Sequence, residues 1–204
     1  MTGDFELKHR VAREAATLLY FGAEKEYKQA KEKAAQTFGV HFLPSNLEVA
    51  LELDKIAEEN EGEKRRERLI QMREEALEMM NLLNLFCPVL IGSVWRGTIK
   101  QGSDIDLAVY ADDPEQITSV LKAEGIKVLK TAWTTVNKRG ATLESFHIFA
   151  ETAAKYGLEI VVRSREEAGK KRKCETFGDE LKGLTLKELE KVLKSNPTQQ
   201  FIPS

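Results

Sequence analysis

The sequence is poor in the residues that stabilise small secreted domains and bind soft metals. Its 204 residues include two cysteines, Cys87 and Cys174, and three histidines. This count excludes a disulfide framework, and no Cys/His spacing typical of a zinc site is present. Long hydrophobic runs are also missing, since the most apolar stretch, residues 82–91, is too short to span a bilayer and includes Asn84 and Pro88. The first ten residues lack the apolar centre of a signal peptide, so we expect a cytoplasmic protein without membrane contact.

A strong excess of charge of either sign is missing as well. The 31 basic and 33 acidic side chains give a formal net charge of −2, which argues against a protein that coats nucleic acid through bulk charge. The charges are spread unevenly, however, because residues 163–204 carry ten basic and seven acidic side chains. An electropositive surface is therefore expected near the C-terminal end.

The first 87 residues have the composition of a helical region. Good helix formers without proline fill residues 8–35, with Gly22 as their weak point. Ser45 and Glu48 have the spacing of a capping box and predict the start of a second helix. A break at Gly62 separates it from a third helix, whose apolar residues recur at i, i+3, i+4 and i+7.

From Pro88 onward the pattern changes to short strands and helices. Apolar runs that suit strands lie at residues 88–91, 105–110, 126–129, 146–150 and 158–162. Helices are expected at residues 114–123 and 184–193, and residues 195–204 are expected to be frayed. Helices followed by mixed strands and helices predict an α+β fold, a mixed sheet with helices packed on one side. We divide it into a helical N-terminal region (1–87), a core (88–165) and a basic loop with a C-terminal helix (166–204).

Gly92 and Ser93 directly follow the strand expected at residues 88–91. Glycine lets the backbone approach a ligand closely, and a helix that begins at Ser93 would point its free N–H groups at an anion such as a phosphate. Arg96 adds a positive charge nearby. Taken alone, a Gly-Ser pair after a strand is also what an ordinary turn contains.

Asp104 and Asp106 stand two residues apart in an otherwise apolar run. Alternate residues of a strand share a face, so both carboxylates would project together while Ile105 and Leu107 point into the core. Their repulsion would need compensation, and oxygen ligands of this kind suit Mg²⁺ or Mn²⁺. A solvated acidic face on an edge strand is the alternative.

Residues 91–109, IGSVWRGTIKQGSDIDLAV, combine both features. The Gly-Ser turn, the Arg96-Gly97 pair and the segment Ser103-Asp104-Ile105-Asp106-Leu107 resemble the DNA polymerase β nucleotidyltransferase superfamily, especially its minimal nucleotidyltransferase branch. The motif covers about 20 residues, and the order of strands and helices extends the resemblance to roughly residues 88–162. The chain departs from the family at Val94, where many members carry a second basic residue.

The resemblance implies a nucleotidyltransferase core preceded by the helical region. In such a core, an acceptor hydroxyl attacks the α-phosphate of an NTP such as ATP, and pyrophosphate leaves. Asp104 and Asp106 would hold Mg²⁺ or Mn²⁺. The nucleotide contacts would come from Gly92, Ser93, Arg96 and Ser103.

The family also uses a third carboxylate from a neighbouring strand, and the sequence offers two candidates. Glu159 lies inside the otherwise apolar run of residues 158–162, where an unpartnered acid would be costly to bury. It would complete the metal site or accept the proton of the attacking hydroxyl. Glu144, just before Phe146, is the second candidate. We favour Glu159, although the family position is commonly aspartate.

Two further features each allow a structural as well as a functional interpretation. Arg163, Arg165 and residues 170–173 form a basic cluster, which suits a polyanion such as RNA or is simply a solvated loop. His147 lies between Phe146 and Ile148 in an expected strand and has the pattern of a structural histidine.

The sequence does not identify the acceptor. The same core serves RNA, protein and small-molecule acceptors in the family. An antitoxin-like or regulatory module built on this fold would act through a protein partner instead. The N-terminal helices would then set the acceptor or form the partner surface, and a homodimer is a further expectation.

Overall fold

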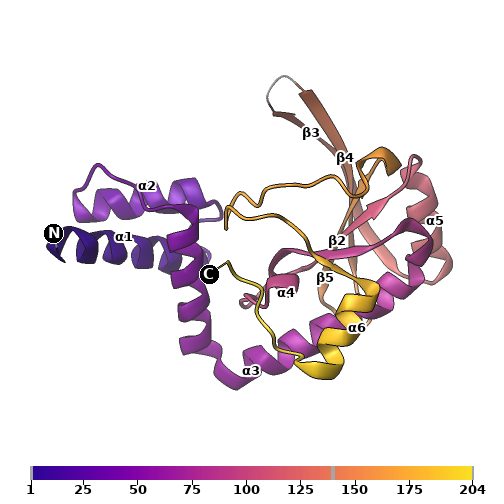
Figure 1. Ribbon diagram of the computed structural model, residues 1–204, viewed down its shortest axis with the longest axis horizontal. Coiled ribbons are helices and arrows are strands. Elements are labelled where there is room, and N and C mark those ends of the chain that lie inside the picture. Colours follow the sequence, from indigo (N-terminus) through magenta and orange to yellow (C-terminus); the bar gives the residue numbers. More distant parts are fainter. Residues whose placement is uncertain (1, 139–140, 204) are drawn as a thin grey trace.

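The computed structural model describes residues 2–138 and 141–203. The chain begins with α1 (Thr2–Tyr20), α2 (Tyr27–Phe38) and α3 (Asn46–Leu82), which form the indigo-to-purple part of Figure 1. The helical run predicted over residues 8–35 is two helices rather than one. Gly22 adopts a φ of +72° between them, a conformation that glycine permits and that ends the helical path.

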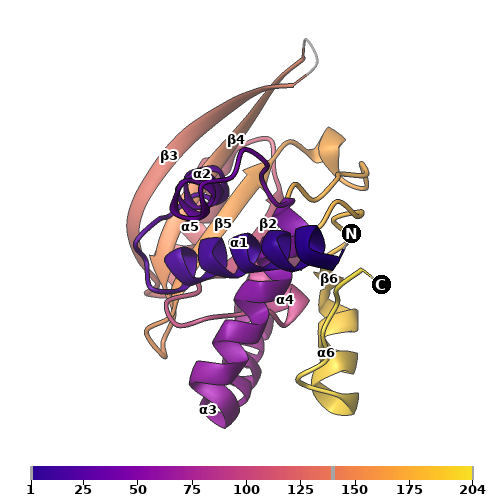
Figure 2. The same ribbon diagram turned by 90° about the vertical axis from the view of Figure 1, so that its left-hand side faces the viewer.

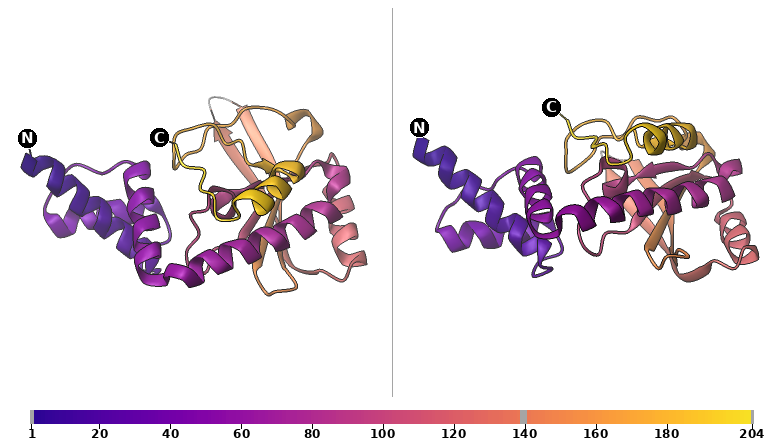
Figure 3. Two further views of the ribbon diagram at one scale, coloured as in Figure 1. Left: turned by 60° about the horizontal axis from the view of Figure 1, so that its bottom comes forward. Right: turned by 90° about the horizontal axis from the view of Figure 1, so that it is seen from below.

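Helix α3 begins and bends where the sequence predicts. The Ser45 hydroxyl accepts a hydrogen bond from the Glu48 backbone N–H at 3.2 Å, and the Glu48 carboxylate accepts one from the Ser45 N–H at 2.7 Å. Gly62, at φ 52° and ψ −128°, interrupts the helical backbone. Figure 3 shows the helix changing direction on its way to the sheet.

Buried side chains form two hydrophobic clusters that meet along α3. The first consists mainly of alanines from α1 and α2, packed against Val49 and Ile56 of α3. The second contains α3 from Leu69 onward, together with one face of the sheet. The bend at Gly62 therefore marks the place where the chain passes from one core to the other.

The rest of the chain builds a mixed sheet of six strands in the order β3-β4-β5-β2-β1-β6. The strands are β1 (Val89–Ile91), β2 (Ile105–Tyr110), β3 (Lys127–Lys138), β4 (Ala141–Glu151), β5 (Gly157–Arg163) and β6 (Leu184–Thr185). Helical segments are α4 (Gly92–Arg96), α5 (Pro114–Ala123), α6 (Leu186–Ser195) and the 3₁₀ turns Asn84–Phe86 and Arg165–Glu167. Strands β2 and β5 pair in parallel, and the other pairs are antiparallel. The predicted α+β class, with helices preceding a mixed sheet, is confirmed.

Strands β3 and β4 are longer than predicted. The sequence indicates strands only at residues 126–129 and 146–150, whereas the two strands pair from Lys127↔Glu151 to Lys138↔Ala141. They extend together beyond the rest of the sheet (Figures 1 and 2). Trp133, just before this extension, is 64 % exposed, and Thr134 and Thr135 after it are exposed as well. These side chains are not buried in the core, so the sequence there lacks the alternating apolar pattern of a half-buried strand.

Helices α3, α5 and α6 pack on one face of the sheet. Leu107 and Ile160 point into that core, so the alternate residues of β2 and β5 point to the opposite face. Asp106 and Glu159 lie on this second face. It is the face on which the candidate site is built.

A long connection, residues 164–183, crosses from β5 toward the helical region and returns to β6; we call it the crossing segment (Figure 1). Its two limbs are joined by the Leu181 N–H, which donates to the Arg172 carbonyl at 2.7 Å, and by an isolated bridge between Lys173 and Glu180. Near its tip, the Asn46 side-chain amide donates to the Glu175 carbonyl at 3.2 Å. The segment is therefore tied to both halves of the molecule.

The C-terminal residues 196–203 are not frayed, contrary to expectation. They run back along the core and are held by Arg73, a buried residue of α3. Its guanidinium donates at 2.7–3.1 Å to the backbone carbonyls of Val94, Trp95, Pro197 and Gln199. Within the described residues, no helix is both long and apolar enough to cross a membrane.

Candidate active site

The turn after β1 lies directly against a carboxylate of β2. Gly92 opens α4 with a φ of +71°, and a Cβ added there would overlap the Oδ2 atom of Asp106. Only glycine meets both conditions, the left-handed backbone and the missing side chain. The predicted close approach at this turn is therefore made to Asp106 by the chain itself.

Strand pairing brings the predicted carboxylates to one place on the sheet. Asp106 pairs in register with Glu159 of β5 on one side and with Ile91 of β1 on the other. Asp104 precedes β2 by one residue, and its carboxylate packs against Gly157, which has no room for a Cβ. We refer to Asp104, Asp106 and Glu159 as the carboxylate row. It combines residues more than 50 positions apart in the sequence.

The electrostatics of the row favour a cation. Burial, with help from the charges of Glu159 and Asp104, raises the pKa of Asp106 to about 7. Burial and the charge of Glu159 also raise the pKa of Asp104. Both shifts have the causes expected for carboxylates crowded together away from water. A positive charge placed between them would remove the repulsion.

Glu159 has a partner that the sequence did not suggest. The His147 Nδ1 atom lies 2.6 Å from the Glu159 Oε1 atom, and His147 Nε2 lies 2.9 Å from the Ser145 hydroxyl. His147 therefore links Glu159 to Ser145 across the β4–β5 pair and fixes the orientation of the Glu159 carboxylate. The sequence does show that residues 145, 147 and 149 alternate with the core-facing Phe146 and Ile148 and so share the opposite face of the strand. It does not show that this strand pairs with the one that contains Glu159.

The other candidate for the third carboxylate lies elsewhere. Glu144 is exposed and pairs in register with Thr135 of β3. It alternates with Ser145 and His147 along β4, so its side chain lies on the face of the sheet opposite Glu159. The geometry thus favours Glu159 over Glu144.

The donor set of the row suits a hard divalent cation. All three side chains offer carboxylate oxygens, which Mg²⁺ and Mn²⁺ prefer. Two of these carboxylates are packed against glycines that leave them space. Among the described residues, however, no three or more His, Cys, Asp or Glu side chains already converge on one point as metal ligands. The chemistry of the row fits the ion, and the carboxylates would have to move closer to a common point to bind it.

A cavity of about 310 Å³ opens beside the Gly92 turn; we call it the turn cavity. Gly92, Ser93, Arg96 and Ser103, the four predicted nucleotide contacts, all line it. Its far wall is apolar. That wall is formed by Tyr27 of α2, Ala50 and Leu53 of α3, and Phe177 and Leu181 of the crossing segment.

Sequence reasoning missed this far wall because its residues come from three distant segments. None of Tyr27, Leu53 and Phe177 belongs to a motif, and only the tertiary fold brings them to the Gly92 turn. Burial raises the pKa of Tyr27 to about 12. Its hydroxyl therefore stays protonated at neutral pH and remains a hydrogen-bond donor.

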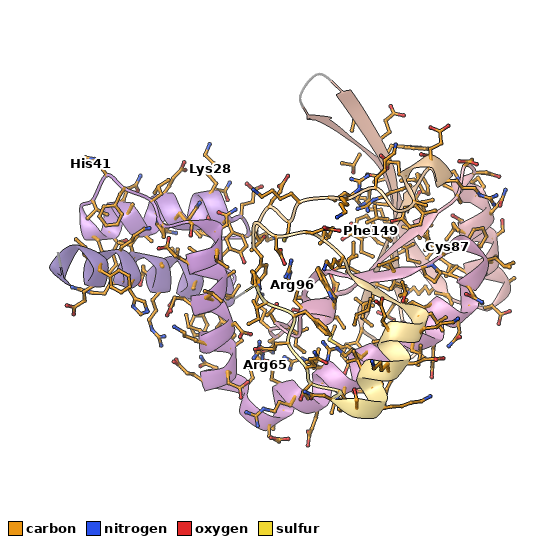
Figure 4. The ribbon with its side chains drawn as sticks, viewed as in Figure 1. Lys28, His41, Arg65, Cys87, Arg96 and Phe149 are labelled. Carbon is orange, nitrogen blue, oxygen red and sulfur yellow. The ribbon has the colours of Figure 1, made fainter. Side chains whose placement is uncertain are left out.

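Arg96 lines the turn cavity but is engaged by the chain itself. Its guanidinium donates to the two Asp179 carboxylate oxygens at 2.6 and 3.1 Å and to the Phe201 carbonyl at 2.8 Å. The rings of Trp95 and Phe177 lie on it, with centroids 4.3 and 4.2 Å from Cζ. Figure 4 shows Arg96 between the helical region and the sheet. This arginine fastens the crossing segment and the C-terminal residues to α4.

The other polar residues near the Gly92 turn form fewer hydrogen bonds within the chain than Arg96 does. The Ser103 hydroxyl accepts a hydrogen bond from the Lys100 N–H at 2.9 Å, which closes the loop before β2 and leaves its own O–H to donate. Ser93 is half-buried, and its backbone carbonyl accepts the Thr98 N–H at 3.0 Å. Lys100 also lines the turn cavity. Hydroxyls and an ammonium therefore line the turn cavity, and the cavity adjoins the carboxylate row through Gly92, which packs against Asp106.

Comparison with known proteins gives one family match and several distant structural similarities. A family model described as a nucleotidyltransferase domain matches residues 88–195. Among solved structures, the Cid1 poly(U) polymerase with MgGTP bound is 19 % identical over 48 % of this chain and 33 % of that chain, with a TM-score of 0.33. The poly(A) polymerase complex GLD-2–GLD-3 is 14 % identical over 56 % and 40 %, with a TM-score of 0.32. The chain thus spans well under half of either structure, and similarity at this level says nothing about substrate. A search of curated proteins found no match.

Proposed function

Because the chain belongs to the family of nucleotidyltransferase domains, we propose that it transfers a nucleoside monophosphate from an NTP to a hydroxyl acceptor. In this reaction the acceptor oxygen forms a bond to the α-phosphorus, and the bond between that phosphorus and the pyrophosphate oxygen breaks. The observation that carries the proposal is the register of Asp106 beside Glu159, with the Gly92 turn packed on Asp106. A transferase of this class needs carboxylates and a phosphate-sized space at one point.

Asp104, Asp106 and Glu159 are the residues we assign to a divalent cation, Mg²⁺ or Mn²⁺. When bound, such an ion would neutralise charge on the phosphate oxygens and make the α-phosphorus more open to attack. The support from this chain is the crowding that raises the pKa of Asp106 and Asp104. Glu159 would either complete this ligand set or accept the proton that the attacking hydroxyl loses. In either role His147 keeps its carboxylate in place.

The turn cavity is the proposed binding site of the donor nucleotide. Its polar end, with Gly92, Ser93, Ser103 and Lys100, suits the β and γ phosphates. Its apolar end suits the nucleoside, because aromatic rings such as Tyr27 and Phe177 stack on bases regardless of sequence. A volume of about 310 Å³ is at the small end of the range of ligand pockets.

Arg96 can contribute less to phosphate binding than its motif position implies. Both protons of its Nη1 atom and one of Nη2 are used by Asp179 and Phe201. A phosphate would be reached only by the remaining N–H groups, at Nε and Nη2. We therefore assign Arg96 mainly to holding the cavity wall.

The test is a screen of the four labelled NTPs against RNA, protein and small-molecule acceptors, with and without Mg²⁺. The wild-type chain should transfer label and release pyrophosphate, and Asp104→Asn/Asp106→Asn should not. The matched control is Asp112→Asn/Asp113→Asn, a pair of acids just after β2 that lies outside the row. Equal activity in the two double variants would overturn the proposal.

The same screen separates the two candidates for the third carboxylate. Glu159→Gln should abolish transfer, whereas Glu144→Gln should leave it unchanged. Both substitutions remove one negative charge and keep the shape of the side chain. The reverse result would move the third carboxylate to β4.

A regulatory module acting through a protein partner is the second candidate. It is favoured by exposed apolar side chains on the helical region, with Phe5 76 % and Phe21 70 % exposed. Exposed large apolar residues of this kind suit a partner surface. A partner that co-purifies with the chain, together with no transfer to any acceptor, would favour this function over the first.

A further inference from the structure

A second cavity, of about 680 Å³, lies on the open face of the sheet under the crossing segment; we call it the basic groove. Its floor is formed by Val89 and Ile91 of β1 and by Ala108 and Tyr110 of β2. Its walls come from the two limbs of the crossing segment and the start of α6. None of the predicted nucleotide contacts lines it.

The floor of the basic groove continues from the carboxylate row. Strand register places Ile91, Asp106 and Glu159 side by side in one row across the sheet. The next row on the same face contains Val89 and Ala108, and Tyr110 follows two residues further along β2. At about 3.3 Å per residue, Ala108 lies roughly 7 Å and Tyr110 roughly 13 Å from Asp106. An elongated ligand in the groove would therefore have one end at the carboxylates.

The walls of the groove carry a strong excess of positive charge. Six basic residues line it, against a single acid, Glu180. The six are Arg163, Lys170, Lys171, Arg172, Lys182 and Lys187.

Much of this charge is not neutralised within the chain. Lys171 pairs with Glu180 at 3.2 Å and Arg172 with Glu167 at 2.7 Å. Lys170, Lys182 and Lys187 form no ion pair within the part of the chain that the structure describes. Burial, and secondarily the charge of Arg172, lowers the pKa of Arg163, as expected where cations crowd together. The groove is therefore prepared for an anionic ligand.

We propose that the basic groove binds the 3′-terminal segment of a single-stranded polynucleotide and delivers its terminal hydroxyl to the carboxylate row. This inference rests on the proposed function and names its acceptor. Proteins that bind single strands combine a positively charged groove with apolar and aromatic surfaces for the bases. The lysines of the walls supply the first, and Tyr110 with the apolar floor supplies the second. An acidic peptide would match the charge but would make no use of that flat floor.

The donor and the acceptor would then approach the row from two sides. The turn cavity reaches it through Gly92, which packs on Asp106. The basic groove reaches it through Ile91 and Ala108, which neighbour Asp106 on β1 and β2. This arrangement places the attacking hydroxyl and the α-phosphate at the same carboxylates without overlap of the two ligands.

The test compares two triple variants of the full chain. Lys170→Gln/Lys182→Gln/Lys187→Gln removes three exposed cations from the groove. Lys25→Gln/Lys64→Gln/Lys122→Gln removes three exposed lysines that line none of the cavities described above. Binding of labelled single-stranded RNA and DNA is measured by fluorescence anisotropy over a series of salt concentrations. Thermal unfolding of each variant is recorded to confirm that the fold is retained.

The groove variant should bind the strand at least about tenfold more weakly at low salt, and its salt dependence should be shallower by about 2 in log–log slope. The control variant should match the wild type, and all three proteins should bind Mg·NTP equally. Wild-type chain should extend a strand that ends in a 3′-hydroxyl but not one that ends in a 3′-phosphate. A preference for RNA over DNA in binding and extension would identify RNA as the natural form of the acceptor, and equal use would leave the class as any single strand.

Three results would overturn the inference. If the groove and control variants bind the polynucleotide equally and still transfer NMP to another acceptor, the basic groove is not the acceptor site, while the proposed function stands. Displacement of the strand by polyglutamate at equal charge would indicate an acidic protein partner instead. Absence of Mg·NTP binding and of transfer to every acceptor would remove the proposed function, and the acceptor role with it.

Discussion

The turn cavity and the basic groove are both lined by residues that neighbour the carboxylate row, Gly92 in the first and Ile91 and Ala108 in the second, yet they are built in different ways. The turn cavity is closed by apolar residues of the helical region, including Tyr27 and Leu53. The basic groove contains no residue of α1, α2 or α3 and is lined instead by the sheet floor and lysines. Under the proposed function, the helical region would therefore contribute to donor binding, in addition to the acceptor or partner role predicted from the sequence.

The two cavities also share a wall. The crossing segment contributes Phe177 to the turn cavity and Lys170 and Arg172 to the basic groove, and Leu181 lines both. A change in this segment should affect both sides, whereas a change in α2 should affect only one. We therefore compare substitutions at four places: the row, its junction with the turn cavity, the shared wall and α2. Their effects should show which residues support the turn cavity, the basic groove or both.

The largest effect is expected at the row itself, in the metal-free protein. Because the pKa of Asp106 is raised to about 7, the folded chain holds a proton there that the unfolded chain has already lost between about pH 4 and pH 7. Stability should therefore fall as pH rises through this window, by up to about 4 kcal/mol. Urea unfolding in EDTA at a series of pH values measures this slope.

Asp106→Asn is the control for that prediction. The amide cannot ionise, so the variant should lack this part of the slope, and Mg²⁺ at pH 8 should stabilise the wild type but not the variant. An unchanged pH dependence in Asp106→Asn would contradict the assignment of the shift to this carboxylate.

The next effect is expected where the row meets the turn cavity. Gly92→Ala forces a non-glycine residue into a φ of +71° and adds a methyl group against the Asp106 carboxylate. Strain and overlap together should cost about 3 kcal/mol. Gly102→Ala has a similar φ of +78° but nothing within 4 Å, so it should cost only about 1 kcal/mol.

Chemical denaturation of both glycine variants gives the difference. Gly92→Ala should also lose most of the transfer activity, because the methyl group displaces Asp106. Equal losses of stability in the two variants would show that the backbone conformation, and not the contact with Asp106, accounts for the cost.

Much of the local structure could be predicted from the sequence, because its causes are local. The capping box at Ser45, the break at Gly62 and the strands around Asp106 and Glu159 all depend on neighbours a few residues away. The Gly-Ser turn and the two aspartates were recognisable because a short motif positions them. These elements needed no knowledge of the tertiary fold.

The parts that could not be predicted depend on pairing between distant segments. Arg96 has the motif position of a phosphate ligand, but Asp179, which binds its guanidinium, lies 83 residues away. Arg73 holds residues 196–203 from more than 120 positions away. His147 and Glu159 meet only because β4 and β5 pair. No periodicity or spacing in the sequence encodes such contacts.

The shared wall of the two cavities is the third place to test. Asp179→Asn leaves the nearly buried Arg96 guanidinium without its counter-charge. Breaking a fully buried pair costs about 3–5 kcal/mol, but the Asp179 side chain is 29 % exposed, so we expect about 2 kcal/mol. The KM values for both NTP and acceptor should rise, because the crossing segment loosens on both sides.

Asp112→Asn is the matched control for Asp179→Asn. Its carboxylate is 69 % exposed and lies 3.9 Å from the Arg165 guanidinium, and exposed pairs of this kind contribute little. It also accepts the Arg165 backbone N–H at 3.1 Å, a hydrogen bond that the side-chain oxygen of asparagine can keep. Its stability and both KM values should match the wild type. A rise in only one KM in Asp179→Asn would show that the crossing segment does not couple the two cavities.

The smallest effect, and the most selective, is expected on the donor side alone. Tyr27→Ala removes an aromatic wall of the turn cavity without touching the carboxylate row or the basic groove. Loss of stacking on the nucleoside should raise the KM for NTP about tenfold, which corresponds to about 1.4 kcal/mol, with kcat and the acceptor KM retained. Tyr27→Phe keeps the ring and should stay within about twofold of the wild type. Steady-state kinetics with both substrates varied would reveal a changed acceptor KM, which would place α2 on the acceptor side after all.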